Sequence, residues 1–571
     1  MNRIKRLLVL AIAAIILASS AACSQNDPQS TPAPAGTTPG TSATEPANNG
    51  DTPFDPMAKY DPPITISTAV YLDDEMQTFM GLKEGVLENN NWMDAYAEDL
   101  GISITYDWAV PNAQYEQKVN TTIVANDLPD IIAVNASQLR LLVENGMVAD
   151  LTDVFEQYAT PFTKEMMEAD SWIGIGQATF DGRLMALPRV DGNVDNANML
   201  WIRNDWLEAL GRTAPATIDE LIDLAKAFME ADLDGTGQAY GLGAFAGWGN
   251  FLEGGFGELT PFFQGHGAYP QGWVDVNGKA EFGRVQPVMR GVLEKLAEMY
   301  ADGILHREFA TRDLTEDVTA GRVGLLFGQH WLSFWPLQLT IDNNPEADWI
   351  PCPIPTVDGS PAKPMLGGSA GLFYVVNPDF ANPEAVVKLY NYYYDKDCAL
   401  SPNYDGDRFH IAGDRAQDEP EATWQWAVVK SFYPIQNLFI FRGLREYLAT
   451  GNEDLLEIGW ISDAVDSLTD YLEDPIANAV RWGAYRWSGP GGAFSVIDQY
   501  QAHGNFILDL ITYTTDSMVE YNTTLNDMAY TTFTKIIMGV DPIEAFDTYV
   551  SDWHTLGGDK ITAEVNFELG R

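Results

Sequence analysis

Cysteine and histidine are scarce in this chain, with three Cys and six His among 571 residues. Cys352 and Cys398 fit no C-x-x-C pattern, so we expect two buried small residues, with a disulfide between them as the open alternative. The histidines have no metal-ligand spacing, and the sequence contains no H-E-x-x-H, Walker loop or complete G-x-G-x-x-G. These absences argue against the common zinc, thiol and nucleotide sites.

Basic residues are also few. Lys and Arg number 33 against 81 Asp and Glu, which gives a formal net charge of −48. Such a balance argues against nucleic acid as a partner and against an electrostatic grip on an anionic membrane. We therefore expect an acidic, solvated surface and no nucleic-acid ligand.

A long apolar run stands at the N-terminus, from Leu7 to Ala18, and it is too short for a permanent membrane helix. Basic residues precede it and small residues follow it, which predicts a signal peptide over residues 1–22. Cys23 stands where a lipobox places the lipidated cysteine. Because Ser20 replaces the usual Leu, plain secretion stays an alternative to anchoring on the outer face of the cell membrane.

Residues 23–60 are rich in Ser, Thr, Pro, Ala, Gly and Asn. This composition cannot bury enough apolar surface to fold, so we expect a disordered tether after the lipidated Cys23. A flexible coil of this length has an r.m.s. span of ~30–35 Å. That span suits a folded domain held away from a membrane.

Strands and helices alternate after the tether. Strands are predicted at 64–67, 102–106 and 131–134, with helices at 114–125 and 137–145. This alternation is typical of a sheet covered by helices on both faces. The fold class is therefore α/β.

The stretch from Met199 to Leu242 is the most informative part of the chain. Met199–Ile202 is a buried strand candidate, and the short helix after it ends at Gly211. Thr217 and Glu220 form a capping box for a helix with one apolar face. An Asp/Gly loop follows this helix.

The order of these pieces resembles the extracellular solute-binding proteins of bacterial ABC importers, in particular the large lipoprotein subgroup that handles oligosaccharides. In that family R-x-D-W-L-x-x-L-G, P-x-T-x-D-E-L and a D-x-D-G-x-G loop occur in this order. The matching residues here are Arg203, Asp205, Trp206, Leu207, Leu210, Gly211, Pro215, Thr217, Asp219, Glu220 and Leu221. The segments 180–188 and 535–558 resemble further family signatures.

The resemblance implies a periplasmic-binding-protein-like type II fold, with two doubly wound lobes, a hinge and a ligand cleft between them. It places residues 61–189 and about 369–480 in the first lobe, and residues 190–368 with part of 481–571 in the second. Gly367–Gly371 matches G-x-S-x-G, but prolines precede it and a strand follows it. Because a nucleophile elbow needs the opposite context, we expect a return crossing here and no catalytic Ser369.

Ligands of doubly wound lobes sit beyond the carboxyl ends of the strands. Three segments fit that position, and they contain Tyr71 and Asp73, Asn135 and Gln138, and Gln329 to Trp331. By resemblance, Arg189 lies at the first lobe crossing, Trp248 follows the strand that ends near Leu242, and Trp331 stands at a sugar-stacking corner. Trp331 and Trp335 lie four residues apart, so packing in a core is the alternative for that pair. The expected ligand-binding residues are Tyr71, Asp73, Asn135, Gln138, Arg189, Trp248, Gln329, His330, Trp331 and Trp335.

The Asp/Gly loop places oxygen ligands at alternate positions around a tight turn: Asp232, Asp234, Thr236 and Gln238. This spacing is typical of a Ca²⁺ loop. A full loop also needs a later acidic ligand, and Ala239-Tyr240-Gly241 stands there instead. A structural Ca²⁺ and a plain polar turn both stay open, and we expect no required cofactor.

The predicted function is capture of a carbohydrate, in particular an oligosaccharide, by a monomeric lipoprotein that delivers it to an ABC transporter permease. Sixteen Trp suit this function, because sugar C–H faces stack on aromatic rings. We expect no enzymatic activity. A secreted carbohydrate-active enzyme of the glycoside hydrolase kind is the first alternative, and a receptor for a non-sugar solute such as a peptide is the second.

Overall fold

The computed structural model describes most of the chain after the N-terminal region. The described residues are 54–82, 85–170, 172–190, 192, 194–233, 235, 237, 239–246, 251–252, 254–410, 422–511 and 513–571. Cys23 and the part of the predicted tether before residue 54 lie outside them. In the described part, no helix is both long enough and apolar enough to cross a membrane.

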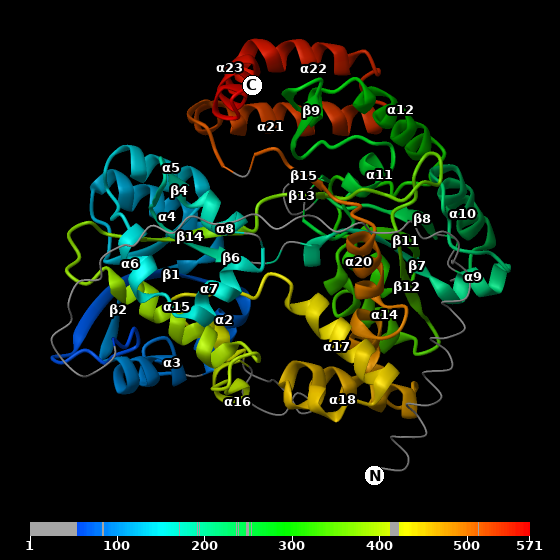
Figure 1. The fold of residues 1–571 in the computed structure, drawn as a ribbon. Coiled ribbons are helices and arrows are strands. Elements are labelled where there is room, and N and C mark those ends of the chain that lie inside the picture. Colours follow the sequence, from blue (N-terminus) through cyan, green and yellow to red (C-terminus); the bar gives the residue numbers. More distant parts are fainter. Residues whose placement is uncertain are drawn as a thin grey trace, which may run out of the picture.

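The first lobe is built on a five-stranded sheet, shown in blue to cyan with one later green strand in Figure 1. β1 pairs in parallel with its two neighbours in the sheet, whereas the late strand β14 runs antiparallel to both of its neighbours. The strands in sheet order are β2 (Ile102–Pro111), β1 (Ile64–Leu72), β3 (Ile131–Val134), β14 (Ala370–Val376) and β6 (Leu187–Val190). Every residue of β3 is buried, because helices cover both faces of the sheet there.

Helices of the first lobe come from three separate stretches of the chain. They are α2 (Asp74–Leu82), α3 (Asn91–Ala95), α4 (Asn112–Ala125), α5 (Ala136–Glu144), α6 (Thr152–Tyr158), α7 (Pro161–Glu168), α8 (Ile173–Gln177), α15 (Glu384–Asp397), α16 (Gly406–Phe409) and α18 (Gly459–Glu473). Together with the sheet they enclose one hydrophobic core, which runs from Ile66 to Leu468 in sequence.

The second lobe contains a four-stranded sheet with the order β12 (Trp349–Cys352), β7 (Met199–Arg203), β11 (Val323–Gly328) and β8 (Tyr240–Gly243). β11 is antiparallel to β7 and parallel to β8. The helices that pack on this lobe are α9 (Asn204–Leu210), α10 (Ile218–Ala231), α11 (Thr260–Gly265), α12 (Val288–Ala301), α13 (Thr315–Thr319), α14 (Leu337–Asn343), α19 (Trp482–Ser488) and α20 (Ala493–Ala502).

The predicted capping box at the start of α10 is confirmed. Thr217 accepts a hydrogen bond from the Glu220 amide, and the Glu220 side chain accepts one from the Thr217 amide. Gly211 ends α9 with φ of +60°, a left-handed conformation that costs glycine little. The local signals of the central stretch therefore form as predicted.

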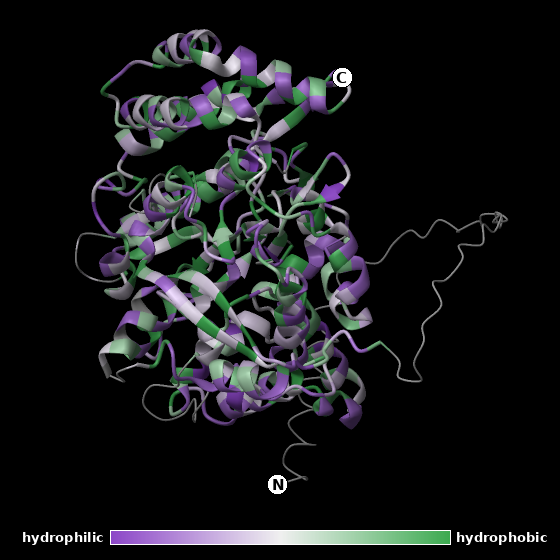
Figure 2. Ribbon diagram, turned by 90° about the vertical axis from the view of Figure 1, so that its left-hand side faces the viewer, coloured by the Kyte–Doolittle hydropathy of each residue, from purple (hydrophilic) through white to green (hydrophobic). Residues whose placement is uncertain are grey.

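Three C-terminal helices form a layer at one end of the molecule, next to the short strands β9 (Trp273–Val276) and β10 (Lys279–Phe282) (Figure 1). They are α21 (Asp516–Ile537), α22 (Ala545–Trp553) and α23 (Asp559–Glu568). Along these helices hydrophilic and hydrophobic segments alternate in Figure 2, as amphipathic packing requires. Their buried faces join the core of the second lobe.

The lobes are joined at several places. The segment after β6 leads to β7, and the segment 366–369 leads back to β14. A third passage runs through 429–437 into α17 (Gln436–Thr450), whose Ile440 and Leu444 pack in the first core and whose Leu438 and Phe441 pack in the second. The Val190 amide donates to Ser431 Oγ at 3.2 Å, which joins the first passage to the third.

The structure bears on the predicted tether and on the two cysteines. The tether was predicted to extend to residue 60, but residues 54–60 pack on the first lobe. The Tyr60 hydroxyl lies 2.7 Å from Glu384 Oε1, and Phe54 contacts the ring of Tyr158 at 5.2 Å. The expectation of two buried cysteines is confirmed: Cys352 and Cys398 are free, in different cores.

Candidate functional site

A pocket of about 310 Å³ lies beside the two crossing segments that join the lobes, and all of its lining residues fall between Gly192 and Gly368. Its wall comes from both crossing segments and from the loops beyond β11 and before α11. The lining residues are Gly192, Asn196, Asn198, Gly254, Gly255, Glu258, Gln271, Gln329, Met365, Leu366, Gly367 and Gly368. Amide and carboxylate side chains, together with the backbone groups of the glycines, provide both donors and acceptors for a polar ligand. We call this the interlobe pocket.

Gln329, a predicted ligand residue, lines the interlobe pocket directly after β11. The indole N–H of Trp331 donates to Gln329 Oε1 at 2.7 Å, and the indole N–H of Trp201 donates to the Gln329 carbonyl at 3.2 Å. Gly255 has φ of +70°, and a Cβ there would lie 2.9 Å from Gln329 and 3.1 Å from the Trp331 ring. A glycine is therefore required for Gln329 and Trp331 to approach this wall.

Trp331 and Trp335 form an aromatic pair beside Gln329. Their rings are nearly parallel, with centroids 6.3 Å apart and an interplanar angle of 18°. Trp331 is partly buried, whereas Trp335 is 37% exposed and meets the edge of Phe256 at 5.4 Å. Simple core packing therefore does not describe Trp335, and a stacking role for the pair stays a prediction.

His330 lies between Gln329 and Trp331 in the sequence, but its ring points in another direction. Its ring is buried against Phe494 at 4.9 Å, and its Nδ1 lies 2.9 Å from the indole nitrogen of Trp487. Burial lowers the pKa of His330 to about 3, so the ring is neutral and Nδ1 accepts this hydrogen bond. The structure does not place His330 among the residues that line the interlobe pocket.

On the first lobe, Tyr71 and Arg189 were predicted separately and lie together. The Arg189 guanidinium donates to the Tyr71 hydroxyl and lies 5.7 Å from the ring of Phe432. The Lys430 ammonium lies 5.2 Å from the Tyr71 ring. These four residues form a cationic and aromatic cluster at the carboxyl end of β1, which we call the Arg189 cluster.

Lys430 and Phe432 were not predicted from the sequence. They stand on the third passage between the lobes, whereas the sequence predicted only two crossings. A lysine that follows the apolar pair Val428-Val429 was the available signal. Lys430 is buried, and its amide donates to the Tyr374 hydroxyl at 3.0 Å.

The three remaining first-lobe candidates cap helices. Asn135 and Gln138 form a reciprocal capping box at the start of α5, and Gln138 Nε2 also donates to Asn120 Oδ1 at 2.8 Å. Asp73 Oδ1 accepts from the Met76 amide at 2.8 Å at the start of α2. These hydrogen bonds occupy much of the polar capacity of the three side chains, so ligand contact by them stays a prediction.

The proposed metal loop is described only in part. Asp232 ends α10 with φ of +44°, and its Oδ1 accepts from the Gly237 amide at 2.8 Å. Asp234, Thr236 and Gln238 lie outside the described residues, as does Trp248. Among the residues that the structure describes, no group of three or more His, Cys, Asp or Glu could hold a metal ion.

A buried carboxyl stands beside the interlobe pocket. Asp195 lies between Val194 and the pocket residue Asn196, and its Oδ2 accepts from the Asn437 amide at 2.9 Å. Burial raises the pKa of Asp195 to about 7, against the opposing effect of the Asn437 and Leu438 amides. This group titrates near neutral pH at the joint between the lobes.

Comparisons with known proteins agree with this architecture. The model of the family described as "Bacterial extracellular solute-binding protein" matches residues 72–397, more than half of the chain. In solved structures, an alginate-binding protein has a TM-score of 0.60 at 17% identity, covering 91% of this chain and 100% of its own. An extracellular solute-binding protein from Bifidobacterium longum subsp. infantis has a TM-score of 0.59 at 16% identity, and the match covers 89% of this chain and 98% of that protein.

Two curated relatives match shorter segments. A fructooligosaccharide ABC transporter substrate-binding protein of Streptococcus pneumoniae is 30% identical over 152 residues, which cover 25% of this chain and 28% of the relative. A polygalacturonan/rhamnogalacturonan-binding protein of Bacillus subtilis is 25% identical over 228 residues, which cover 38% of this chain and 43% of the relative. The matches thus span less than half of either relative.

Proposed function

Because the chain belongs to the bacterial extracellular solute-binding protein family, we propose that it captures an oligosaccharide between its lobes and delivers it to the permease of an ABC transporter. Like other members of this family, the chain has an α/β fold of periplasmic-binding-protein type II, with two lobes. The proposed lobes are residues 61–189 with about 369–480, and residues 190–368 with part of 481–571. The relatives named above bind carbohydrates, which supports this ligand class.

The observation that carries the proposal is the wall of the interlobe pocket. Gln329 lines the pocket, and behind it Trp331, which is hydrogen-bonded to Gln329, forms the aromatic pair with Trp335. Sugars need this combination, because their hydroxyls require planar polar partners and their C–H faces pack on aromatic rings. On the first lobe the Arg189 cluster, whose residues do not line this pocket, is proposed to supply cationic donors and further rings to the ligand.

The protein is proposed to act as a monomeric lipoprotein on the outer face of the cell membrane, held by lipidated Cys23. The curated relatives include a lipoprotein of Bacillus subtilis, which supports this location. The membrane contact is proposed to be the lipid anchor alone.

The function is tested by a binding panel. Tryptophan fluorescence and thermal shift should be measured with fructo-oligosaccharides, oligogalacturonides and alginate oligomers. A receptor shows saturable binding and a raised Tm, because ligand stabilises the native state by RT ln(1 + [L]/Kd). Binding by none of the panel, together with binding of a peptide, would replace the proposal by the non-sugar receptor.

The enzymatic alternative needs a second measurement on the same samples. After prolonged incubation with the purified protein, a receptor returns each oligosaccharide intact, whereas a glycoside hydrolase yields shorter products. Time-dependent appearance of products would favour the enzyme.

The Asp232 loop is a candidate Ca²⁺ site, with a plain polar turn as the alternative. If Asp232 and Asp234 hold Ca²⁺, a chelator lowers the Tm of the wild type but not of Asp234→Ala. Equal Tm values with and without chelator leave the polar turn.

A further inference from the structure

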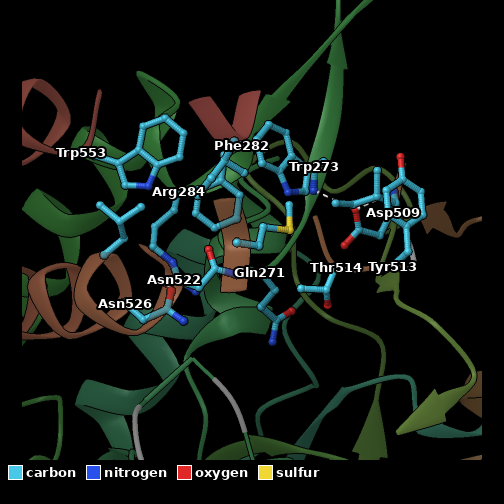
Figure 3. A pocket seen from close by; sticks show the side chains of 14 residues that line it. Gln271, Trp273, Phe282, Arg284, Asp509, Tyr513, Thr514, Asn522, Asn526 and Trp553 are labelled. Carbon is cyan, nitrogen blue, oxygen red and sulfur yellow. Dashed lines mark hydrogen bonds between the residues drawn. The ribbon is translucent and has the colours of Figure 1, made fainter. Parts of the chain in front are cut away.

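A second pocket, of about 230 Å³, lies between the β9–β10 hairpin and helix α21 (Figure 3). It adjoins the interlobe pocket, since Gln271 lines both. The neighbouring Gly272 is equally close to both: a Cβ there would lie 2.5 Å from Met365 Sδ and 2.6 Å from Asp509 Oδ2. Met365 lines the first pocket and Asp509 the second, so the backbone at Gly272 lies close to a lining residue of each pocket. We call the new site the α21 pocket.

One side of the α21 pocket is polar. Arg284 is fixed there: its Nη1 donates to Asn526 Oδ1 at 2.7 Å, and its Nε donates to the Pro270 carbonyl at 3.0 Å. Figure 3 shows Arg284 reaching toward Asn526 and Asn522. Asp509 supplies the opposite charge, with Oδ1 accepting from the Trp273 amide at 2.9 Å. The pocket thus holds one cation and one anion within a frame of amides.

The other side is aromatic. Trp273 and Trp553 are buried, and Phe282 packs between them, with its ring 5.4 Å from Trp273 and nearly parallel to Trp553 at 5.7 Å. A wall with amides, one charge of each sign and aromatic rings suits an uncharged polyhydroxyl ring, which needs many hydrogen bonds and one apolar face. The volume exceeds the ~150 Å³ cavity that accepts a benzene molecule in an engineered protein.

We propose that the α21 pocket binds an uncharged terminal sugar ring of an oligosaccharide whose remaining rings occupy the interlobe pocket. This inference rests on the proposed function and adds a determinant of chain length to it. The shared Gln271 lies where the ligand passes from one pocket to the other.

The rim of the α21 pocket is also held by the first lobe. Arg140 Nη1 of α5 donates to the carbonyl of Thr514, a residue that lines the pocket, at 2.9 Å. Next to Asp509, β15 (Ile507–Leu508) pairs with β13 (Met365–Leu366) on the return crossing. A ring bound here therefore lies at the junction of both lobes and the C-terminal helices, where it can favour closure.

The test compares chain lengths in two α21 variants. Asn522 lines the pocket from an exposed position, so Asn522→Trp fills the pocket without burying new polar groups. Thr524→Trp is the matched control, because Thr524 is exposed on the same helix and does not line the pocket. Calorimetric titrations use fructo-oligosaccharides and oligogalacturonides of two to six units.

We expect wild-type affinity for the uncharged series to rise with chain length. Asn522→Trp should weaken binding of the longest members about 10-fold and of the shortest less than about twofold, since only long ligands reach the pocket. Thr524→Trp should match the wild type. Asn522→Leu, which keeps the size and loses the amide, should weaken the long members about 3- to 10-fold and shows the effect even if Asn522→Trp folds poorly.

The outcomes separate the two proposals. If both Asn522 variants keep the wild-type affinity at every chain length, or lower it equally at every length, the α21 pocket is overturned. The proposed function then still stands. Wild-type binding to the oligogalacturonides alone overturns the uncharged ring. No wild-type binding to either series overturns both proposals for these sugars.

Discussion

Arg140 on helix α5 of the first lobe lies 2.6 Å from Asp516 at the start of α21, across the boundary between the two cores. Its guanidinium also lies 3.6 Å from Glu568 and donates to the Thr514 carbonyl. Both acids belong to the C-terminal layer, so this one side chain ties the layer to the first lobe. The lobe arrangement seen here is stabilised by that tie.

Arg140→Met should therefore open the molecule. Exposed ion pairs contribute about 0.2–1 kcal/mol each, so we expect a small loss of closure, with a larger radius of gyration and up to ~5-fold weaker ligand binding. Small-angle scattering and calorimetry at low salt measure both, and 1 M salt should reduce the difference from wild type.

Arg290→Met is the matched control for this change. Arg290 forms ion pairs with Glu544 and Asp547, at 3.3 Å and 3.7 Å, and all three residues belong to the second lobe and its C-terminal layer. Its loss should leave the radius of gyration and the affinity unchanged. An equal response of the two variants would contradict the cross-lobe role of Arg140.

Asp195 predicts a pH dependence of stability. Its native pKa of about 7 exceeds the value of ~3.9 in unfolded chains, so the native state binds the extra proton between these pH values. Stability from this group is complete below pH ~4 and is lost as pH rises to 7. Arg442 opposes the shift, and Tyr433 lies nearby.

Asp195→Asn removes the titrating group and keeps an acceptor for the Asn437 amide. Relative to this variant, the wild-type free energy of unfolding should fall by up to about 4 kcal/mol between pH 4 and 7. Urea titrations of both proteins at several pH values measure the difference. A constant difference across this range would show that Asp195 has an ordinary pKa.

Local sequence signals predicted most of the fold because each has a local physical cause. The capping box of Thr217 and Glu220 and the left-handed Gly211 need no tertiary contact to be recognised. The third passage through Lys430 and the dual packing of α17 depend on contacts between distant segments, so no periodicity announced them. The packing of Tyr60 on Glu384 is of the same kind.

The candidate site divides in the same way. The position of Gln329 after β11 follows from the strand, and the structure places it in the interlobe pocket. Neighbouring His330 shares that position in sequence but turns its ring toward Trp487, a residue 157 positions away. A strand end therefore predicts which residues come near a pocket, whereas the direction of each side chain depends on packing that the sequence does not display.

Membrane attachment is predicted to depend on Cys23. Cys23→Ala removes the proposed lipid anchor, and the acidic chain with its charge of −48 offers no electrostatic attraction to an anionic bilayer. The variant should therefore appear in the culture medium, as shown by immunoblots of membrane and medium fractions. Ser24→Ala is the control and should stay with the membrane, and retention of Cys23→Ala there would contradict lipid anchoring.

Trp331 is predicted to stack on a sugar ring beside the interlobe pocket, next to the lining residue Gln329. A stacked aromatic ring contributes ~1–3 kcal/mol by analogy with base stacking, so Trp331→Ala should weaken binding ~5- to 150-fold. The indole also donates to Gln329, so part of the loss reflects the freed amide. Calorimetry with the best oligosaccharide of the panel and urea unfolding should be performed on the same preparation.

Trp349→Ala supplies the contrast, because Trp349 is completely buried in the second core, on β12. That change should cost ~3–5 kcal/mol of stability and leave the affinity of the folded fraction as in the wild type. Trp331 is partly buried and its neighbour Trp335 is exposed, so Trp331→Ala should cost less stability and more affinity. If Trp331→Ala instead behaves like Trp349→Ala, Trp331 is a packing residue and the stacking site lies elsewhere in the cleft.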